Sequence, residues 1–473
     1  MTLPSTLALP WPLLAGALLW LGGCDLGPDY ARPALEMPAA FRATNVTAEQ
    51  AWPAPEWWHG FGSPELDRLI ADARLHNQNL AQAAARVLQA NAQVSINGAP
   101  LLPAVNGAAN RTYQKSGISG FGYRDTRITS GQASASYEAD FWGRNRAFLD
   151  SAKATALGTR FDQETVALSV VSAVATTYFQ ALGASDRLAV ARRNLAQARE
   201  ILQVFRVRVQ VGTGTALDVA QQEALVAGVS AQIPFLQSQI DQQVIGLGIL
   251  VGHPPEAIAV SGTTLARLPV PVVAAGLPAE LLARRPDVAF AEASIVAENG
   301  NVRAARAAFF PTVQLTAQGG VQSLALGGLF GPGSLLLAAA GSLVQPIFDN
   351  GLRQGNLDQA KARFTELVAS YRQAVLQAFT DVDLALTTVR YTGEQEALER
   401  RAVNVAQRAS DIARAQLAAG TVDITTVLNT QNTLFSDQDT LAQVRLTHFQ
   451  AVINLYKAMG GGFQLPVVPP GTS

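Results

Sequence analysis

The sequence predicts a mixed fold in which short β-strands are joined to long α-helices. This pattern occurs twice, as an internal tandem repeat. Three observations lead to it. Some segments alternate apolar and polar residues with a period of two, others follow a helical period, and the chain matches itself at one constant offset.

The repeat is defined by short motifs, with their prolines and glycines, that recur at a constant spacing. LLPAV at 101–105 recurs as FFPTV at 309–313, so that Pro103 and Pro311 fix an offset of 208 residues. The same offset carries GRNRAFLDSAKA at 143–154 onto GLRQGNLDQAKA at 351–362, and Gly212-Thr213 onto Gly420-Thr421. Because no gap is needed, corresponding elements must have equal lengths. We interpret this as a tandem duplication.

The only cysteine, Cys24, follows an apolar run that ends at Leu21. This run suits the apolar region of an export signal better than a spanning helix, which needs about 20 residues. Leu21-Gly22-Gly23-Cys24 then predicts a lipobox, in which the thiol carries a covalent lipid. A lone buried cysteine is the alternative. Residues 1–23 lack Lys and Arg, and Asp25 favours inner-membrane retention in some bacteria, so the lipobox alone leaves the destination membrane open.

Composition excludes several classes of function. The net charge of −1, from 35 basic and 36 acidic residues, leaves no electrostatic footprint for nucleic acid. One cysteine excludes an intramolecular disulfide and a cysteine zinc site. No catalytic triad or carboxylate pair stands out, so we expect neither an enzyme nor a metal site, and no cofactor beyond the lipid on Cys24. The four histidines show no ligand spacing and are expected at the surface or in packing roles: His59, His76, His253 and His448.

Each repeat is expected to begin with a helix, at 66–98 and 279–306, that ends near a proline. The period then changes to two, in Ser130–Glu138 and Val313–Val321, which predicts strands with one apolar side. Glycine-rich hairpin tips are expected at 115–126 and 324–334. Strands of about 9–11 residues are what a membrane β-barrel uses, and we expect any membrane crossing to be made by strands.

Long helices follow the strands. One is expected from about 350 to 419, roughly 100 Å long, with a coiled-coil-like apolar seam from Val368 to Val389. Gly212 and Gly420 should end these helices, and returning helices should begin just after them. Each repeat therefore makes a helical hairpin whose tip lies about 90–100 Å from the strands. Four strands cannot close a barrel with an interior, so a homo-oligomer is required.

Several stretches resemble the TolC-like outer membrane factor family, in its lipoprotein branch with OprM- and NodT-type members. They are CDLGPDYARP (24–33), WWHGFGSPELDRLI (57–70), RRPDV…ARAAFFP (284–311) and LYKAMGGG (455–462). The resemblance covers essentially all of the chain after the signal. It implies a homotrimer whose twelve pooled strands form one transmembrane β-barrel, continued by a long periplasmic α-helical barrel. The expected segments are a signal peptide at 1–23, an N-terminal anchor and equatorial segment at 24–65, repeat 1 at 66–252, a Pro-rich connector at 253–278, repeat 2 at 279–462 and a C-terminal tail at 463–473.

The resemblance also implies a function and partners. The trimer would be the outer-membrane, lipid-anchored exit duct of a tripartite, RND-type multidrug efflux system in a Gram-negative bacterium, expelling drugs or other small molecules. Its partners would be outer-membrane lipid, a periplasmic membrane-fusion adaptor and an inner-membrane pump. The alternatives are the same duct for protein or metal-ion export, and a structural periplasmic coiled-coil lipoprotein.

Relatives close the periplasmic tip by polar links and acidic rings. Here the corresponding positions are Asp218 in repeat 1 and Thr426 and Asn429 in repeat 2, where relatives often carry aspartates. Asp423 is nearby and can supply the charge instead. A threefold ring of aspartates would attract cations. The alternative is that Asp218 and Asp423 are helix-start residues; we favour the ring for Asp218 and give the cap at least equal weight for Asp423.

Overall fold

A computed structural model describes residues 27, 30–35, 38, 40–42, 52–118, 122–261, 264–273 and 278–465. The signal segment and Cys24 lie outside the described residues. The chain divides into two compact units. The strand unit contains Arg86–Thr159, Phe290–Tyr371 and the N-terminal residues up to Ala34; the hairpin unit contains Leu35–Ala85, Arg160–Ala289 and the residues from Arg372 onward. Each unit takes segments from both repeats.

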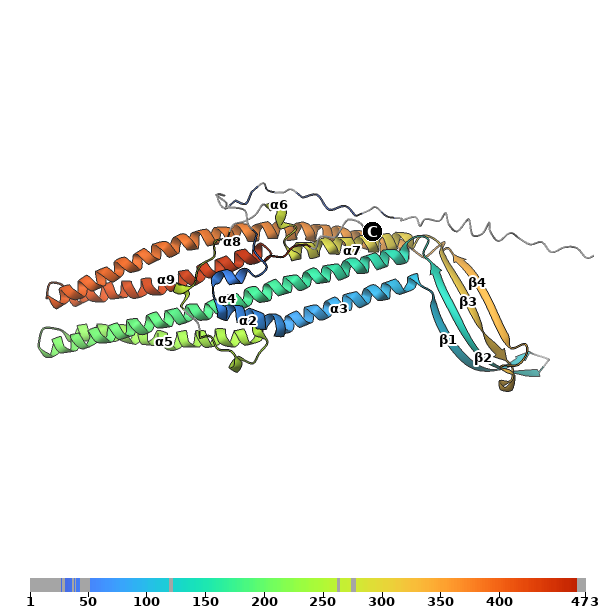
Figure 1. Ribbon diagram of the computed structural model, residues 1–473, viewed down its shortest axis with the longest axis horizontal. Coiled ribbons are helices and arrows are strands. Elements are labelled where there is room, and N and C mark those ends of the chain that lie inside the picture. Colours follow the sequence, from blue (N-terminus) through green and yellow to red (C-terminus); the bar gives the residue numbers. More distant parts are fainter. Residues whose placement is uncertain are drawn as a thin grey trace, which may run out of the picture. The chain divides into compact units, whose positions relative to one another are not determined.

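The strand unit holds one four-stranded antiparallel sheet in the order β1-β2-β3-β4 (Figure 1). The predicted four strands in two hairpins are confirmed. The first tip is shorter than expected, because strand pairing runs through 115–126 as far as Ile118 opposite Gly122. The strands are β1 (Ala104–Ile118), β2 (Gly122–Ala139), β3 (Thr312–Ser323) and β4 (Leu335–Val344).

The register gives the sheet two chemically different faces. Directly opposed residues always have the same parity, as in Lys115 opposite Asp125 and Thr129 opposite Ser323. Opposed side chains point to the same side of a sheet, so all odd-numbered strand residues share one face. That apolar face includes Val105, Leu315, Leu335, Leu337 and Leu343, all exposed. The opposite, polar face includes Asn106, Gln132, Gln314 and Gln318. The predicted two-faced strands are confirmed.

The expectation of one helix at the start of each repeat was wrong, since each is broken in two. In the first repeat the break falls at Asn77, whose ψ of 125° is extended. Its side-chain oxygen accepts hydrogen bonds from the main-chain N–H groups of Asn79 and Leu80, and its amide donates to the carbonyl of Leu250. The four helices are α2 (Pro64–His76), α3 (Gln78–Gly98), α6 (Pro278–Leu281) and α7 (Pro286–Ala307).

The second break occupies the equivalent place. Residue 77 plus the offset of 208 gives Arg285, which precedes Pro286. A proline disfavours helical geometry at the residue before it, so the chain leaves one helix and starts another here. An asparagine cap and a proline thus produce the same interruption in the two repeats.

The long helices match the sequence closely. The helix expected at 350–419 is α8 (Leu352–Ala418), and its counterpart α4 (Arg144–Gln210) has the same 67 residues. The expected seam is buried, with Tyr371, Val375 and Val382 at most 2% exposed. Figure 1 shows α4 returning as α5 (Ala216–Val251) and α8 returning as α9 (Ile424–Ala458). Short 3-10 turns complete the fold: η1 (Trp57–Phe61), η2 (Ala99–Leu101), η3 (Pro255–Ala257), η4 (Leu265–Arg267) and η5 (Leu326–Gly328).

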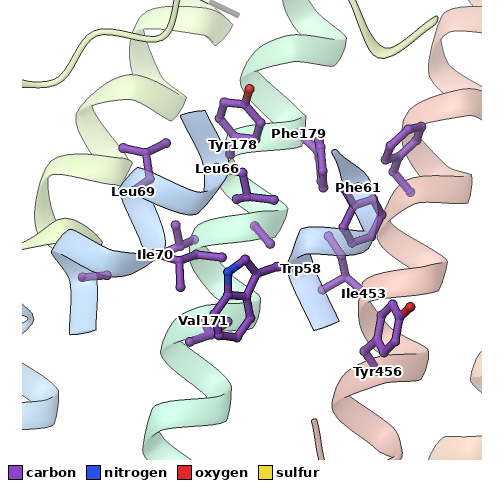
Figure 2. Packing of buried hydrophobic residues seen from close by; sticks show 14 of the residues in the cluster. Trp58, Phe61, Leu66, Leu69, Ile70, Val171, Tyr178, Phe179, Ile453 and Tyr456 are labelled. Atoms are coloured by element: carbon purple, nitrogen blue, oxygen red, sulfur yellow. The ribbon is translucent and has the colours of Figure 1, made fainter. Parts of the chain in front are cut away.

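The main core of the hairpin unit joins segments that are far apart in the sequence (Figure 2). Phe61 of η1 packs against Phe179 of α4 and Phe449 of α9, with ring centroids 4.9 and 5.7 Å away. Among the described residues, one stretch of α4 is long and apolar enough to cross a membrane, but 56% of it is buried within the protein. Its Val171, Tyr178 and Phe179 belong to this core, so we interpret it as a core segment.

Candidate functional site

The two hairpin turns, where the gate residues were expected, close in the same way. Gly212 and Gly420 both have φ of 75°, a left-handed conformation that glycine adopts without strain. The N–H of Thr213 then donates to the carbonyl of Arg208 at 2.8 Å, and that of Thr421 to the carbonyl of Gln416 at 2.9 Å. Both hydrogen bonds obey the offset of 208, so the duplication extends to the helix ends.

Asp218 is part of a capping box at the start of α5. Its carboxylate Oδ2 accepts from the N–H of Thr215 at 2.8 Å, and its own N–H donates to Thr215 Oγ1 at 3.2 Å. The carboxylate therefore helps to cap the start of α5, which is the alternative role considered for Asp218. Its membership of a charged ring stays a prediction.

Asp423 is the N-cap of α9. Its Oδ1 accepts from the N–H of Thr426 at 2.9 Å and from Thr426 Oγ1 at 2.7 Å. These hydrogen bonds, the hydroxyl one first, lower the pKa of Asp423 below its ordinary value. Thr215 plus 208 is Asp423 and Asp218 plus 208 is Thr426, so the two repeats use the same pair of residue types with their places exchanged.

Asn429 is exposed and lines a polar groove of about 900 Å³ bounded by α4, α5 and α9. Amide and hydroxyl side chains dominate its lining, including Gln221, Gln232, Asn432 and Thr440. Such groups exchange hydrogen bonds with water and carry no charge. The groove is also lined by Arg187 and Asp439, and it can accommodate water and polar solutes.

Two arginines of α4 connect the two hairpins and were not predicted. Arg208 donates to the carbonyl of Leu417 in α8 at 2.6 Å. Arg187 forms a two-pronged ion pair with Asp439 of α9, with N–O distances of 2.7 and 3.1 Å. Between these links, α4 packs its Phe205 against Val427 in an apolar cluster at the tips.

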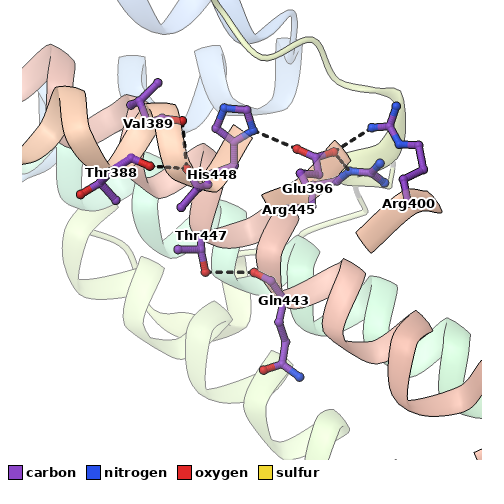
Figure 3. A network of polar contacts seen from close by, with 9 residues as sticks. Thr388, Val389, Glu396, Arg400, Gln443, Arg445, Thr447 and His448 are labelled. Atoms are coloured by element: carbon purple, nitrogen blue, oxygen red, sulfur yellow. Dashed lines mark hydrogen bonds and ion pairs between the residues drawn. The ribbon is translucent and has the colours of Figure 1, made fainter. Parts of the chain in front are cut away.

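A buried carboxylate ties α8 to α9 (Figure 3). Glu396 of α8 accepts from Arg445 Nε at 2.9 Å and contacts His448 Nδ1 at 2.9 Å, while Arg400 of its own helix contacts it at 2.9 Å. The His448 hydrogen bond, with those of Arg445 and Arg400, lowers the pKa of Glu396 to about 2 against the opposing effect of burial. No pattern in the sequence predicted that these residues, about fifty positions apart, meet.

The histidines take the surface and packing positions expected for them. His448 packs against Glu396, and His59 contacts Asp67 at 2.7 Å. The rings of His76 and His253 lie 4.8 Å apart, a pairing that the sequence did not predict. Across the part of the chain that the structure describes, no group of three or more His, Cys, Asp or Glu side chains is arranged to hold a metal ion.

The fold and the tips can now be compared with known proteins. The model of the outer membrane efflux protein family matches residues 69–253 and 277–461, one match in each repeat. The pyoverdine export outer membrane protein OpmQ of Pseudomonas aeruginosa is 38% identical over 460 residues, which cover 95% of this chain and 96% of OpmQ. The toluene efflux pump outer membrane protein TtgI of Pseudomonas putida is 34% identical over 461 residues, covering 95% of this chain and 97% of TtgI.

A solved structure agrees with these relatives. The open-state crystal structure of the Neisseria gonorrhoeae outer membrane channel MtrE has a TM-score of 0.86 and 30% identity, covering 93% of this chain and 99% of that chain. The similarity thus extends over both repeats and over the strands as well as the helices. The chain belongs to the outer membrane efflux protein family.

Proposed function

We propose that three copies of this chain form the exit duct of a tripartite efflux system, driven by an RND-type pump, that expels small organic molecules across the outer membrane. The duct performs no chemistry. A periplasmic adaptor and an inner-membrane pump supply cargo and energy.

The observation that carries this proposal is the open, two-faced sheet. β1 and β4 are its edges, and each pairs on one side only among the described strands. An unpaired edge inside a membrane leaves main-chain N–H and C=O groups without partners, which costs several kcal/mol per group. Pairing β4 of one copy with β1 of the next satisfies both edges. Three copies then give twelve strands with the apolar face toward lipid and the polar face toward a lumen.

The helices support the same assembly. Five apolar side chains of α8 follow one another at intervals of seven residues and are 55–61% exposed: Leu384, Tyr391, Leu398, Val405 and Ile412. Heptad spacing is that of a coiled-coil seam, so this stripe requires a second helix along its length. A neighbouring copy of the chain supplies one. We call these five residues the α8 stripe.

The cargo is proposed from the relatives. OpmQ is named for pyoverdine export and TtgI for toluene efflux, and both are small organic molecules. Protein or metal-ion export through the same duct, and a purely structural coiled-coil lipoprotein, are the other functions considered. The two-faced sheet argues against the structural role, because a coiled coil alone has no use for it.

The lipid on Cys24 belongs to this proposal. The lipid would be an additional tether to the outer membrane. The barrel by itself would already keep the trimer in that membrane. Support comes from the lipobox and from the apolar run before it.

The function is tested by measuring growth inhibition by, and intracellular accumulation of, a panel of dyes, detergents and antibiotics. Cells that carry the gene are compared with cells that lack it. Hypersensitivity with raised accumulation, restored by the intact gene, is expected. Leu398→Asp in the α8 stripe should fail to restore export and should run as a monomer in size-exclusion chromatography, whereas Asn404→Asp, exposed on the same helix outside the stripe, should restore it. Equal restoration by both variants would contradict the proposed assembly.

A further inference from the structure

The apolar face of the sheet carries a group of charged and aromatic residues at the end away from the helices. Arg111, Tyr113 and Lys115 of β1 are odd-numbered and share this face, and all three are exposed. Arg127 of β2 lies opposite Tyr113, and Tyr123 lies opposite Gly117. We call Arg111, Tyr113, Lys115, Tyr123 and Arg127 the basic-aromatic patch.

Two contacts organise the patch. The Lys115 ammonium lies 5.1 Å from the ring centre of Tyr123, and the Arg127 guanidinium lies 5.6 Å from that of Tyr113. The face of an aromatic ring attracts a cation placed over it, so each tyrosine helps to hold its basic partner at the surface of the sheet. Among the described residues, Arg111, Lys115 and Arg127 form no ion pair, although Asp125 lies opposite Lys115 on the same face. The patch therefore presents three cations against one carboxylate.

The second hairpin, β3 and β4, carries no counterpart of the basic-aromatic patch. No charged residue occurs from Ala307 to Phe348, a range that contains β3, β4 and the turn between them. The duplication has kept the strands but not the charges, so each chain has one such patch. A requirement for solubility alone would apply to both tips equally, whereas a specific partner needs the charges at one place.

The same face offers room for an apolar chain below the patch. A shallow hollow of about 520 Å³ is lined by small residues of three strands, among them Ala133, Ala135, Ala317 and Gly319, with Leu337 at its side. Ala133 is six residues along β2 from Arg127, or roughly 20 Å at strand rise. This is the order of length of an acyl chain extending from a headgroup held at the patch.

We propose that the basic-aromatic patch binds the anionic phosphate groups of membrane lipid headgroups in the outer leaflet, with an acyl chain in the hollow beneath. The proposal depends on the placement of the sheet in the outer membrane, with its apolar face toward lipid, and not on the cargo or the partners of the duct. Tyrosines suit the interface between headgroups and acyl chains, and each Lys or Arg near an anionic lipid surface adds to the attraction.

The experiment uses the purified full-length protein in detergent, incubated with lipid A or with lipid A from which the phosphates have been removed. Native mass spectrometry measures the bound lipid. The phosphorylated form should bind several-fold more tightly, and Lys115→Gln and Arg127→Gln should each weaken its binding by roughly fivefold. Equal binding of the two lipid forms would overturn the proposal, as would displacement of lipid A by an equal concentration of inorganic phosphate.

Two further variants separate the patch from general charge. Arg124 is exposed on the polar face of the same strand, so Arg124→Gln removes an equal charge at the same height and should leave lipid A binding unchanged. Asp125→Asn removes the one carboxylate of the patch and should tighten binding. An equal loss with Arg124→Gln, or no gain with Asp125→Asn, would contradict a site on the apolar face. If the protein failed to export drugs but still preferred phosphorylated lipid A, the proposed function would be wrong and the lipid site would stand.

Discussion

Arg208, near the end of α4, donates a hydrogen bond from its guanidinium to the main-chain carbonyl of Leu417, near the end of α8. The final carbonyls of a helix have no partner within the helix and carry partial negative charge, so a cation is stabilised there. This contact joins the two hairpin tips of one chain. In the proposed duct, these tips are where the channel would be closed when no pump is engaged.

Arg208→Ala should therefore raise the basal ion conductance of the protein in planar bilayers, because the tip of α8 loses its link to α4. Arg199→Ala, which removes an exposed arginine from the same helix, is the matched control and should leave conductance unchanged. Equal conductance of the two variants would show that Arg208 has no part in closing the tip.

Asp218→Ala should raise basal conductance or reduce its preference for cations, if three copies of Asp218 form a ring. Loss of the cap should also cost about 1 kcal/mol of helix stability. Thr215→Ala removes the hydroxyl of the same capping box without changing any charge. Should Thr215→Ala alter selectivity as much as Asp218→Ala, or should neither alter it, Asp218 would be a helix cap only.

Glu396 should make the stability of the protein dependent on pH in the acid range. Its pKa is lowered from 4.5 to about 2, so its stabilising contribution is complete above pH 4.5 and is lost as the pH falls toward 2. Glu396→Gln should lower the free energy of unfolding at neutral pH by on the order of 3 kcal/mol, the cost of a broken buried ion pair, and should lower the thermal midpoint with it. The gap between variant and wild type should narrow as the pH falls through that window.

Circular dichroism melting between pH 7 and pH 2 measures this effect. Glu394→Gln is a suitable control, because Glu394 forms an exposed ion pair with Arg390 on the same helix and such pairs contribute at most about 1 kcal/mol. A constant difference between Glu396→Gln and wild type at every pH would argue that packing, rather than charge, explains the loss.

Cys24→Ala should lower the abundance of the protein in the outer membrane more than the export by each assembled trimer. In the proposed duct the lipid would assist sorting and tethering, whereas the sheet would span the membrane. Quantitative immunoblotting of membrane fractions, combined with accumulation assays, gives export per trimer. Normal abundance with lost export would contradict this division of roles.

The sequence predicted those parts of the fold that local chemistry determines. The period of two between Ser130 and Glu138, the left-handed glycines Gly212 and Gly420, and the equal lengths of the repeats were sufficient for the strands, turns and long helices. The break at Asn77 was missed because it depends on a hydrogen bond to Leu250, 173 residues away. Capping by Asp218 and Asp423 was foreseen as an alternative, because a helix start is also a local feature.

The polar links could not be predicted in the same way. Glu396 meets Arg445 and His448 only because α9 folds back along α8, and which turns face one another depends on side-chain packing over the whole hairpin. The two-pronged contact of Arg187 with Asp439 joins residues from different repeats. A single sequence shows the residue types at such positions but not their pairing.

The equal lengths of α4 and α8 also constrain how this gene can change. Removing seven residues from α4 alone would draw its tip back by about 10 Å relative to that of α8 and separate Arg208 from Leu417. The same deletion made at both places, 208 residues apart, and matched in the returning helices α5 and α9, would shorten the two hairpins together and preserve their contacts. Insertions and deletions in the long helices should therefore survive selection in matched pairs, so that the ancient duplication still governs which lengths descendants of this chain can adopt.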